Sequence, residues 1–316
     1  KFDRSAVPLA TFRAPPAGAP EYAPQFGGEL RNYRDIPNQG ALSDDLQRTL
    51  VHGYYAATSY MDAQLGKVLD AVDRLGLGKN TIIVLWGDHG WHLGDHGMWC
   101  KHTNYEQATR VPLLVSAPGL ASNTATSALL ETVDIYPTLC ELAGLTPPEG
   151  LDGRSAVAVL RDPTKAHRER SLQVYPRGSK EKGPMIGRAI RTARYRLVEW
   201  KKPGAESSTA DLELYDYETD PLETKNLALE RPEVVSDLRA ILAKEPEARP
   251  QISANAPQKQ ASNAKPMDRV ELFNRKDENK DGKLTREEFL KGQPDPDKAP
   301  ERFVRFDVDK NGELSR

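Results

Sequence analysis

Residues 86–106 form the stretch of this sequence whose side chains are best suited to chemistry. Four of the six histidines lie in it, and Asp88 and His89 directly follow the apolar run 81–86. That run is predicted to form a buried strand, and ligand sites in open α/β sheets lie beyond the carboxyl ends of strands. Since a carboxylate oxygen and an imidazole nitrogen can together hold a divalent cation, we expect Asp88 and His89 to be metal ligands.

Two other interpretations of the same stretch remain open. His89, His92 and His96 have the spacing of a helix face and could bind zinc, although the glycines at 90, 94 and 97 disfavour a helix there. Alternatively, Asp88 and His89 satisfy only the amides of a turn. The second Gly-Asp-His-Gly copy, at 94–97, follows no predicted strand, so we expect it to shape the loop.

Lys101 is the candidate for contact with an anionic substrate. It lies between Cys100 and His102 in the same glycine-rich stretch, where its ammonium group can act as a point charge. We predict that Lys101 is a catalytic and substrate-binding residue and that His102 also binds substrate. An ordinary surface lysine is the alternative.

The C-terminal tail contains a twelve-residue pattern of oxygen donors. Residues 277–288 match the calcium loop of an EF-hand, in which positions 1, 3, 5, 7 and 12 supply oxygens and position 6 is a glycine. Gly282 is at position 6, and the predicted calcium ligands are Asp277, Asn279, Asp281, Lys283 through its carbonyl, and Glu288.

A second loop begins nineteen residues after the first one ends. Its predicted ligands, in the same register, are Asp307, Asp309, Asn311 and Glu313. The printed sequence stops at Arg316, two residues short of position 12. Because position 12 supplies two ligand oxygens, we expect this second site to bind calcium weakly.

Composition excludes several classes of protein. The 316 residues carry a formal net charge of −2, which argues against a nucleic-acid binder that works by bulk charge. No apolar run approaches the roughly 20 residues of a membrane span. Two cysteines cannot form a disulfide framework. The chain is therefore expected to be a globular protein of about two domains.

Helical and strand patterns alternate in the first half of the sequence. Apolar residues recur at three- and four-residue steps from Ser43 to Leu75, which predicts a long helix with Ser43 as its N-cap. With strands expected at 81–86 and 110–116 and a helix at 132–142, we predict an α/β domain with a largely parallel or mixed sheet. Further on, short strands at 172–175, 185–200 and 212–217 predict a small antiparallel sheet, followed by a helix at 230–244.

The order of these motifs resembles the sulfatase family, and within it the iduronate-2-sulfatase-like and choline-sulfatase-like branch. The motifs that carry the resemblance are Tyr55-Ala-Ala-Thr-Ser-Tyr-Met-Asp62, Asn80-Thr-Ile-Ile-Val84, both Gly-Asp-His-Gly copies, Lys101-His-Thr-Asn104, Arg110-Val-Pro-Leu113 and Tyr175-Pro-Arg177. The resemblance spans about residues 42–242 and implies the alkaline-phosphatase-like fold. It also implies calcium ligation by Asp88 and His89, sulfate contact by Lys101, a sulfated small molecule or sulfated glycan as substrate, and a periplasmic or extracellular location.

The sequence departs from the family at the nucleophile. Sulfatases use a Cys or Ser in a C-x-P-S-R or S-x-P-x-R stretch, matured to formylglycine, and neither Cys100 nor Cys140 lies in such a stretch. In the family that stretch lies upstream of the point at which this sequence begins. The resemblance therefore implies a C-terminal half that needs its upstream half for the formylglycine, and we expect the chain alone to be inactive.

These observations predict four segments. Residues 1–165 are expected to be the C-terminal part of a sulfatase α/β domain and residues 166–245 the sulfatase C-terminal subdomain. Residues 246–266, with four prolines and Ile252 as their one large aliphatic residue, are expected to be a linker. Residues 267–316, half of which are charged, are expected to be a helical pair of EF-hands.

Three functions are compatible with the sequence. A fragment of a metal-dependent sulfuric ester hydrolase with a calcium-binding tail is the leading hypothesis. A phosphoric or phosphonic ester hydrolase of the same superfamily would share the fold and the use of a metal ion and would differ in its nucleophile. A non-catalytic calcium-dependent binding protein is the third, and an activity assay on the chain joined to its upstream half separates it from the enzymes.

Overall fold

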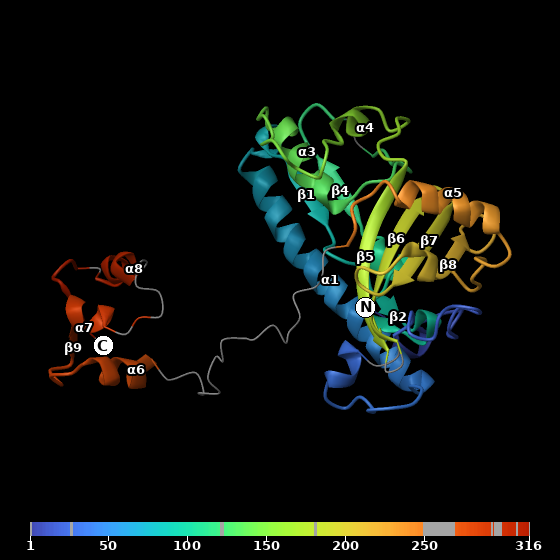
Figure 1. The fold of residues 1–316 in the computed structure, drawn as a ribbon. Helices are drawn as coiled ribbons and strands as arrows, with labels where there is room; N and C mark the ends of the chain where they lie inside the picture. Colours follow the sequence, from blue (N-terminus) through green and yellow to red (C-terminus); the bar gives the residue numbers. More distant parts are fainter. Residues whose placement is uncertain are drawn as a thin grey trace. The chain divides into compact units, whose positions relative to one another are not determined.

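The structure, a computed structural model, is shown in Figure 1. It describes residues 2–25, 28–120, 123–179, 182–248, 269–291, 293, 299–307 and 309–315. The chain divides into two compact units, Lys1–Pro250 and Gln251–Arg316, which are described separately below. The predicted α/β region and antiparallel sheet lie in the first unit, and the charged tail lies in the second.

The longest helix, α1, spans Asp44–Arg74 and confirms the predicted helix together with its cap. The Ser43 side chain accepts a hydrogen bond from the Leu46 amide, which the first helical turn would otherwise leave unpaired. The negative charges of Asp44 and Asp45 in that first turn interact favourably with the positive end of the helix dipole. None of the described helices is both long and apolar enough to cross a bilayer.

The apolar stripe of α1 is fully covered only near the start of the helix. Gln47 and Val51 are its buried residues. Large apolar side chains further along are exposed, namely Tyr54, Tyr60, Met61 and Val68. In the first unit, α1 therefore presents an uncovered apolar surface over most of its length.

Two short strands, β1 (Ile83–Trp86) and β4 (Leu113–Ser116), pair antiparallel with Leu85 opposite Leu114. The prediction of a parallel or mixed sheet is therefore wrong for the strands that this chain supplies. The predicted burial is also wrong, because Trp86 is 49% and Leu114 58% exposed. The physical reason is that the pair is two-stranded, so that no further described strand flanks either edge.

The connection from β1 to β4 carries the histidine-rich stretch. It contains β2 (His92–Leu93), β3 (Trp99–Cys100) and α2 (Glu106–Thr109). β2 and β3 form a small antiparallel ribbon, with His92 opposite Cys100. Two further helices follow β4, namely α3 (Ile135–Leu142) and α4 (Val157–Arg161).

The predicted antiparallel sheet is confirmed, with four strands in sequence order, although the run 185–200, expected as one strand, forms two strands separated at 193–194. They are β5 (Arg170–Ser179), β6 (Gly183–Thr192), β7 (Tyr195–Lys201) and β8 (Asp211–Asp216). The helix α5 (Pro232–Leu242) confirms the predicted final helix and lies across the strands in Figure 1.

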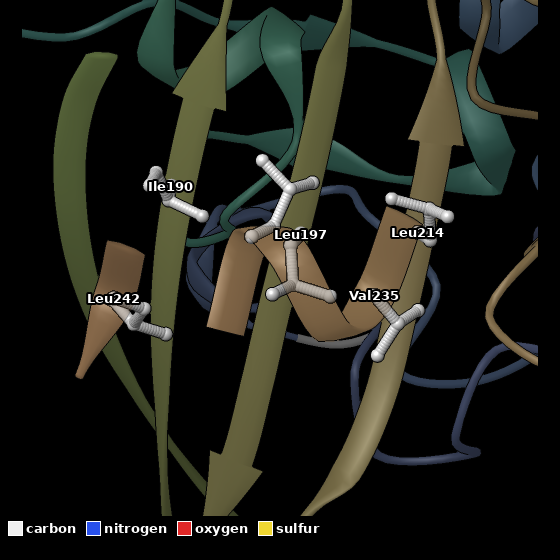
Figure 2. Packing of buried hydrophobic residues seen from close by; sticks show 6 residues of the cluster. Ile190, Leu197, Leu214, Val235 and Leu242 are labelled. Carbon is white, nitrogen blue, oxygen red and sulfur yellow. The ribbon is translucent and has the colours of Figure 1, made fainter. Parts of the chain in front are cut away.

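Apolar side chains join α5 to one face of this sheet. Ile190, Leu197 and Leu214 lie directly opposite one another on β6, β7 and β8, and all three are fully buried. Figure 2 shows them facing Val235 and Leu242 of α5. Burial of a side chain of this size contributes about 1.5–3 kcal/mol, so this cluster holds helix and sheet together.

The N-terminal segment covers the opposite face of the same sheet. Ala23 packs against Trp200, and the Tyr22 and Trp200 rings meet edge to face with centroids 5.6 Å apart. The Ala17 amide donates to the Thr224 carbonyl (2.8 Å). This segment therefore runs over the sheet.

Buried ion pairs connect the sheet to the chain that follows Lys101. The guanidinium of Arg196, 1% exposed, binds the carboxylates of Glu223 (2.8 Å) and Glu106. Burial alone would raise the pKa of Glu106, but the neighbouring Arg196 lowers it below its usual value. The Tyr105 hydroxyl donates to Glu213 (2.8 Å). The sheet thereby fixes the segment beside the candidate site.

The second unit contains two helix–loop pairs. Its elements are α6 (Arg269–Lys276), β9 (Lys283–Thr285), α7 (Arg286–Leu290), α8 (Ala299–Phe306) and β10 (Glu313–Ser315). β9 and β10 pair antiparallel, and the Phe289 ring meets those of Phe303 and Phe306. The predicted linker, 246–266, lies outside the described residues except for 246–248.

Candidate active site and calcium-binding loops

Asp88 and His89 lie in the loop directly after β1, as the sequence predicted. The Gly90 amide donates to the Ala108 carbonyl (2.8 Å) and brings two stretches of backbone together. A Cβ atom at Gly90 would lie 2.0 Å from the Gln107 carbonyl oxygen, so only glycine fits at this position. The loop conformation that presents Asp88 and His89 is therefore fixed by close backbone contact.

The side chains of Asp88 and His89 are arranged as two potential metal ligands. The Asp88 side chain is 85% exposed, and its Oδ2 lies 3.6 Å from His89 Nε2. His89 Nδ1 lies 2.9 Å from the Gly90 carbonyl oxygen, to which it can only donate. Nε2 then carries the lone pair that a metal needs.

Asp88 supplies the oxygen that calcium prefers and His89 supplies a nitrogen, but these two donors are an incomplete set. Within the described ranges no three His, Cys, Asp or Glu side chains converge in a way that could hold a metal ion. Further ligands would have to come from water, substrate or other protein groups. Metal binding by Asp88 and His89 stays a prediction.

Lys101 directly follows β3 and has two partners. Its Nζ lies 2.8 Å from Glu29 Oε2 and 5.2 Å from the centre of the Trp91 ring. The hydrogen bond to Glu29 raises the pKa of Lys101 above its ordinary value, and the same contact lowers the pKa of Glu29. Lys101 is therefore a firmly protonated, oriented cation, whereas an ordinary surface lysine would be free to move.

His102 is held from three sides. Its Nε2 lies 3.2 Å from Glu29 Oε2 and its Nδ1 lies 2.6 Å from the Tyr175 hydroxyl. The Arg177 guanidinium donates to the His102 carbonyl oxygen. Tyr175 and Arg177 belong to β5, so the antiparallel sheet helps to position the predicted substrate-binding residues.

One cavity connects all four residues predicted for the catalytic region. Asp88, His89, Lys101 and His102 line a space of about 1460 Å³ that extends from β1 and β4 to β5 and β6. A volume of this size accommodates a substrate larger than a single small ion. The cavity is therefore the candidate active site.

Three site residues were missed by the sequence analysis. Trp91 stacks on the His89 ring, with centroids 5.8 Å apart, and also contacts Lys101. Glu29 and Tyr175 bind His102 from opposite sides. The tryptophan next to Gly90 was a usable signal. Nothing local marked Glu29. Tyr175 lies in the Tyr175-Pro-Arg177 motif, but its contact with His102, 73 residues earlier, was not indicated.

The second Gly-Asp-His-Gly copy shapes the loop. It follows the two-residue strand β2, which the sequence analysis did not predict. His96 is 1% exposed, has a φ of 57°, and its Nε2 lies 2.7 Å from the Leu222 carbonyl oxygen. His92 is fully buried and its ring hydrogen-bonds to the Thr103 hydroxyl (2.8 Å). The His89 ring is partly exposed and stacks on Trp91. The three rings therefore do not face one common point, and the alternative of a zinc site formed by His89, His92 and His96 is wrong.

The burial of His92 predicts a loss of stability in acid. Burial lowers the pKa of His92 to about 3, with His96 and Arg177 acting in the same direction. The unfolded chain binds a proton at this residue below about pH 6.5, so stability falls as the pH drops from about 6.5 towards 3. Between pH 6.5 and 5 the loss is about 2 kcal/mol.

Urea unfolding at several pH values tests this prediction. His92→Gln keeps a polar group for Thr103 but does not titrate, so its stability is expected to vary less with pH than that of the unsubstituted protein. Parallel pH profiles for the two proteins would show that the acid sensitivity comes from elsewhere.

The first predicted calcium loop, residues 277–288, is closed by its own backbone amides. Asp277 accepts hydrogen bonds from the amides of Asp281 (3.1 Å) and Gly282 (2.9 Å), and Gly282 has a φ of 81°. Asp281 is also bound by the Asn279 side-chain amide (2.8 Å) and by the Lys283 amide (2.9 Å). These contacts bring positions 1, 3, 5 and 7 into one turn.

Glu288 and the second loop complete the arrangement. Glu288 accepts hydrogen bonds from the Thr285 amide (2.9 Å) at the start of α7 and from the Glu278 amide (3.2 Å) of the loop. Asp307 repeats the Asp277 pattern with the amides of Asn311 and Gly312, both at 3.0 Å. The remaining contacts are Asn311 Nδ2 to Asp309 (2.8 Å), the Glu313 amide to Asn311 (2.8 Å) and Lys283 Nζ to Glu313 (2.7 Å).

Two family models match this chain. The family described as "Sulfatase" matches residues 14–145, and the family described as "N-sulphoglucosamine sulphohydrolase, C-terminal" matches residues 94–247. Together they cover the candidate active site and the antiparallel sheet. The chain is therefore similar to sulfatases over residues 14–247.

Curated relatives agree with the family models. A protein named "Sulfatase" from Formosa agariphila is 30% identical over 224 residues, which are 70% of this chain and 41% of that protein. Iduronate 2-sulfatase of Mus musculus is 30% identical over 250 residues, with 60% of this chain and 45% of that protein covered. The chain thus spans less than half the length of these two relatives.

Solved structures of sulfatases share the fold. A structure titled as BT4656 in complex with its substrate D-glucosamine-2-N,6-O-disulfate has a TM-score of 0.55 at 26% identity, with 64% of this chain and 42% of that chain covered. The phosphonate monoester hydrolase of Silicibacter pomeroyi has a TM-score of 0.60 at 23% identity, covering 77% of this chain and 50% of its own, which shows the fold alone. Two further neighbours, from Bacteroides thetaiotaomicron and Bacteroides fragilis, are titled as putative sulfatases.

Proposed function

We propose that this chain is the C-terminal half of a metal-dependent sulfate ester hydrolase. The observation that carries the proposal is that Asp88 and His89, after β1, and Lys101 and His102, after β3, line one cavity. Asp88 and His89 supply two calcium ligands, and a bound calcium ion would add positive charge for a sulfate group. Lys101 offsets charge on the sulfate oxygens as the ester bond breaks.

An upstream half would supply the formylglycine nucleophile and the remaining metal ligands. The uncovered apolar stripe of α1 and the exposed Trp86 and Leu114 on the β1–β4 pair support this proposal, since such surfaces normally pack on protein. Unpaired edges of β1 and β4 are suited to further strands. We expect a sulfated small molecule or sulfated glycan as substrate and a periplasmic or extracellular location.

The test is the substrate preference of the intact protein, meaning this chain with its upstream half. We expect it to release sulfate from an aryl sulfate much faster than it hydrolyses the matched aryl phosphonate or aryl phosphate. The fold shared with a phosphonate monoester hydrolase makes phosphonic ester hydrolysis the second candidate. A reversed preference would establish that candidate and exclude sulfate ester hydrolysis.

We further propose that residues 267–316 bind calcium. The support is the match of loop 277–288 to the twelve-position pattern and the pairing of β9 with β10, which sets Leu284 opposite Leu314. Calorimetry on the whole chain is expected to give one tail site with a Kd of about 10⁻⁵ to 10⁻³ M, between sensor and extracellular modules.

Glu288→Ala is expected to remove this tail site, because position 12 supplies two ligand oxygens. The matched control is Glu287→Ala, which deletes the same charge from the neighbouring residue in the first turn of α7. Calcium affinity should be nearly unchanged in the control. Equal calcium affinities for Glu288→Ala and the unsubstituted chain would show that residues 277–288 are not the calcium site.

A further inference from the structure

A carboxylate of this chain contacts both Lys101 and His102, the residues proposed to bind sulfate. Glu29 Oε2 is 2.8 Å from Lys101 Nζ and 3.2 Å from His102 Nε2, while the Tyr33 hydroxyl donates to Glu29 Oε1 (2.9 Å). The Glu29 side chain is 27% exposed and that of Lys101 is 25% exposed. The residue proposed to neutralise a sulfate group therefore has an anionic partner within the protein.

Packing holds Glu29 in this position. Glu29 opens a short 3₁₀ helix, Glu29–Asn32, and the next residue, Leu30, is 5% exposed. Leu30 packs in one cluster with Leu42 and with Cys100, the residue immediately before Lys101. Because neighbouring residues on both segments share this cluster, Glu29 is presented to Lys101 by the fold and is not a mobile surface charge.

A fixed carboxylate at this place opposes the binding of another anion. At 2.8 Å it cancels much of the field of the Lys101 ammonium group, and it repels a sulfate oxygen that approaches the same nitrogen. Both Lys101 and His102 must be shared between Glu29 and any sulfate that enters.

We propose that the Glu29 carboxylate competes with sulfate for Lys101 and His102 and thereby sets the affinity of the site for this anion. The carboxylate holds Lys101 and His102 when the site is empty of substrate and returns to them as inorganic sulfate leaves. Weak product binding and rapid product release follow. The identity of the anion rests on the proposed sulfate ester hydrolysis, whereas the competition rests on the geometry of Glu29.

Calorimetric titration of the intact protein with sodium sulfate tests the proposal. Glu29→Gln keeps the size and hydrogen-bonding capacity of the side chain but removes its charge, and we expect it to bind sulfate about tenfold more tightly. The matched control is Glu21→Gln, an exposed carboxylate in the same N-terminal segment, for which sulfate affinity should change less than about twofold.

Two further variants test how the effect arises. In the double variant Glu29→Gln/Lys101→Ala the gain in sulfate affinity should disappear, because the competition acts through Lys101. Tyr33→Phe removes a hydrogen bond that orients Glu29, at a half-exposed position where the fold is not at risk, and a smaller gain in the same direction is expected.

The outcomes separate this inference from the proposed function. Unchanged or weaker sulfate binding in Glu29→Gln and in Tyr33→Phe overturns the competition, even if the intact protein hydrolyses sulfate esters. Tighter sulfate binding in Glu29→Gln, with no sulfate ester hydrolysis by the unsubstituted protein, supports the competition and overturns the proposed function.

Discussion

Asp88→Asn in the intact protein is expected to lower kcat/KM for a sulfate ester by about 10³-fold or more and to remove the bound metal. A metal ion that polarises the reacting group is worth several kcal/mol of transition-state stabilisation. Asp88 supplies the charged oxygen of the predicted ligand pair, and its side chain is 85% exposed in the cavity loop, so the substitution should leave the fold intact. Metal content and steady-state rates measure the two effects together.

The second Gly-Asp-His-Gly copy offers a matched control for this substitution. Asp95 occupies the same place in the second Gly-Asp-His-Gly copy, where it accepts a hydrogen bond from the Leu93 amide (3.2 Å). Asp95→Asn can keep that bond and is expected to retain the metal and most of the activity. Loss of metal from Asp95→Asn, with its retention in Asp88→Asn, would show that the other copy is the metal site.

Lys101→Ala is expected to lower kcat/KM by about 10²- to 10³-fold while the metal content stays unchanged. Removal of one preorganised charge from a site where negative charge develops typically costs about 3 to 4 kcal/mol. Lys79→Ala is the control, because Lys79 is an exposed lysine at the end of a 3₁₀ turn. A kinetically silent Lys101→Ala would mean that Lys101 only pairs with Glu29 and takes no part in the reaction.

Local rules explain the parts of the fold that the sequence predicted well. The cap at Ser43 depends on an amide three residues away, and the spacing of apolar residues along α1 depends on neighbouring helical turns. The strands β5 to β8 are joined in sequence order, so turn residues and alternation predicted the sheet, although they missed the break between β6 and β7. The same holds for loop 277–288, where all the predicted ligands lie within twelve residues.

Features that depend on distant residues could not be predicted. A β-branched apolar run such as 81–86 indicates a strand but neither its direction nor its partner, and β1 pairs with β4 across the whole histidine-rich connection. The spacing of His89, His92 and His96 is helical, yet the backbone turns at Gly94 (φ 102°) and sends the rings to separate environments.

The candidate site was predicted only in its contiguous part. Asp88, His89, Lys101 and His102 lie close together in the sequence and line one cavity in the structure. Glu29 and Tyr175 reach His102 only because the N-terminal segment packs at β3 through Leu30 and because β5 runs past the same loop. Such contacts are set by tertiary packing, and no motif around Glu29 indicates them.

The central claim is that this chain supplies one half of a shared sulfate ester hydrolase site, and the most direct test is sulfate release from an aryl sulfate. The rate is measured for this chain alone, for its upstream half alone, and for the two joined in one polypeptide. Turnover is expected only from the joined protein, and it should be lost in the joined Asp88→Asn variant. Turnover by this chain alone at the joined rate, or none by a folded joined protein, would contradict the central claim.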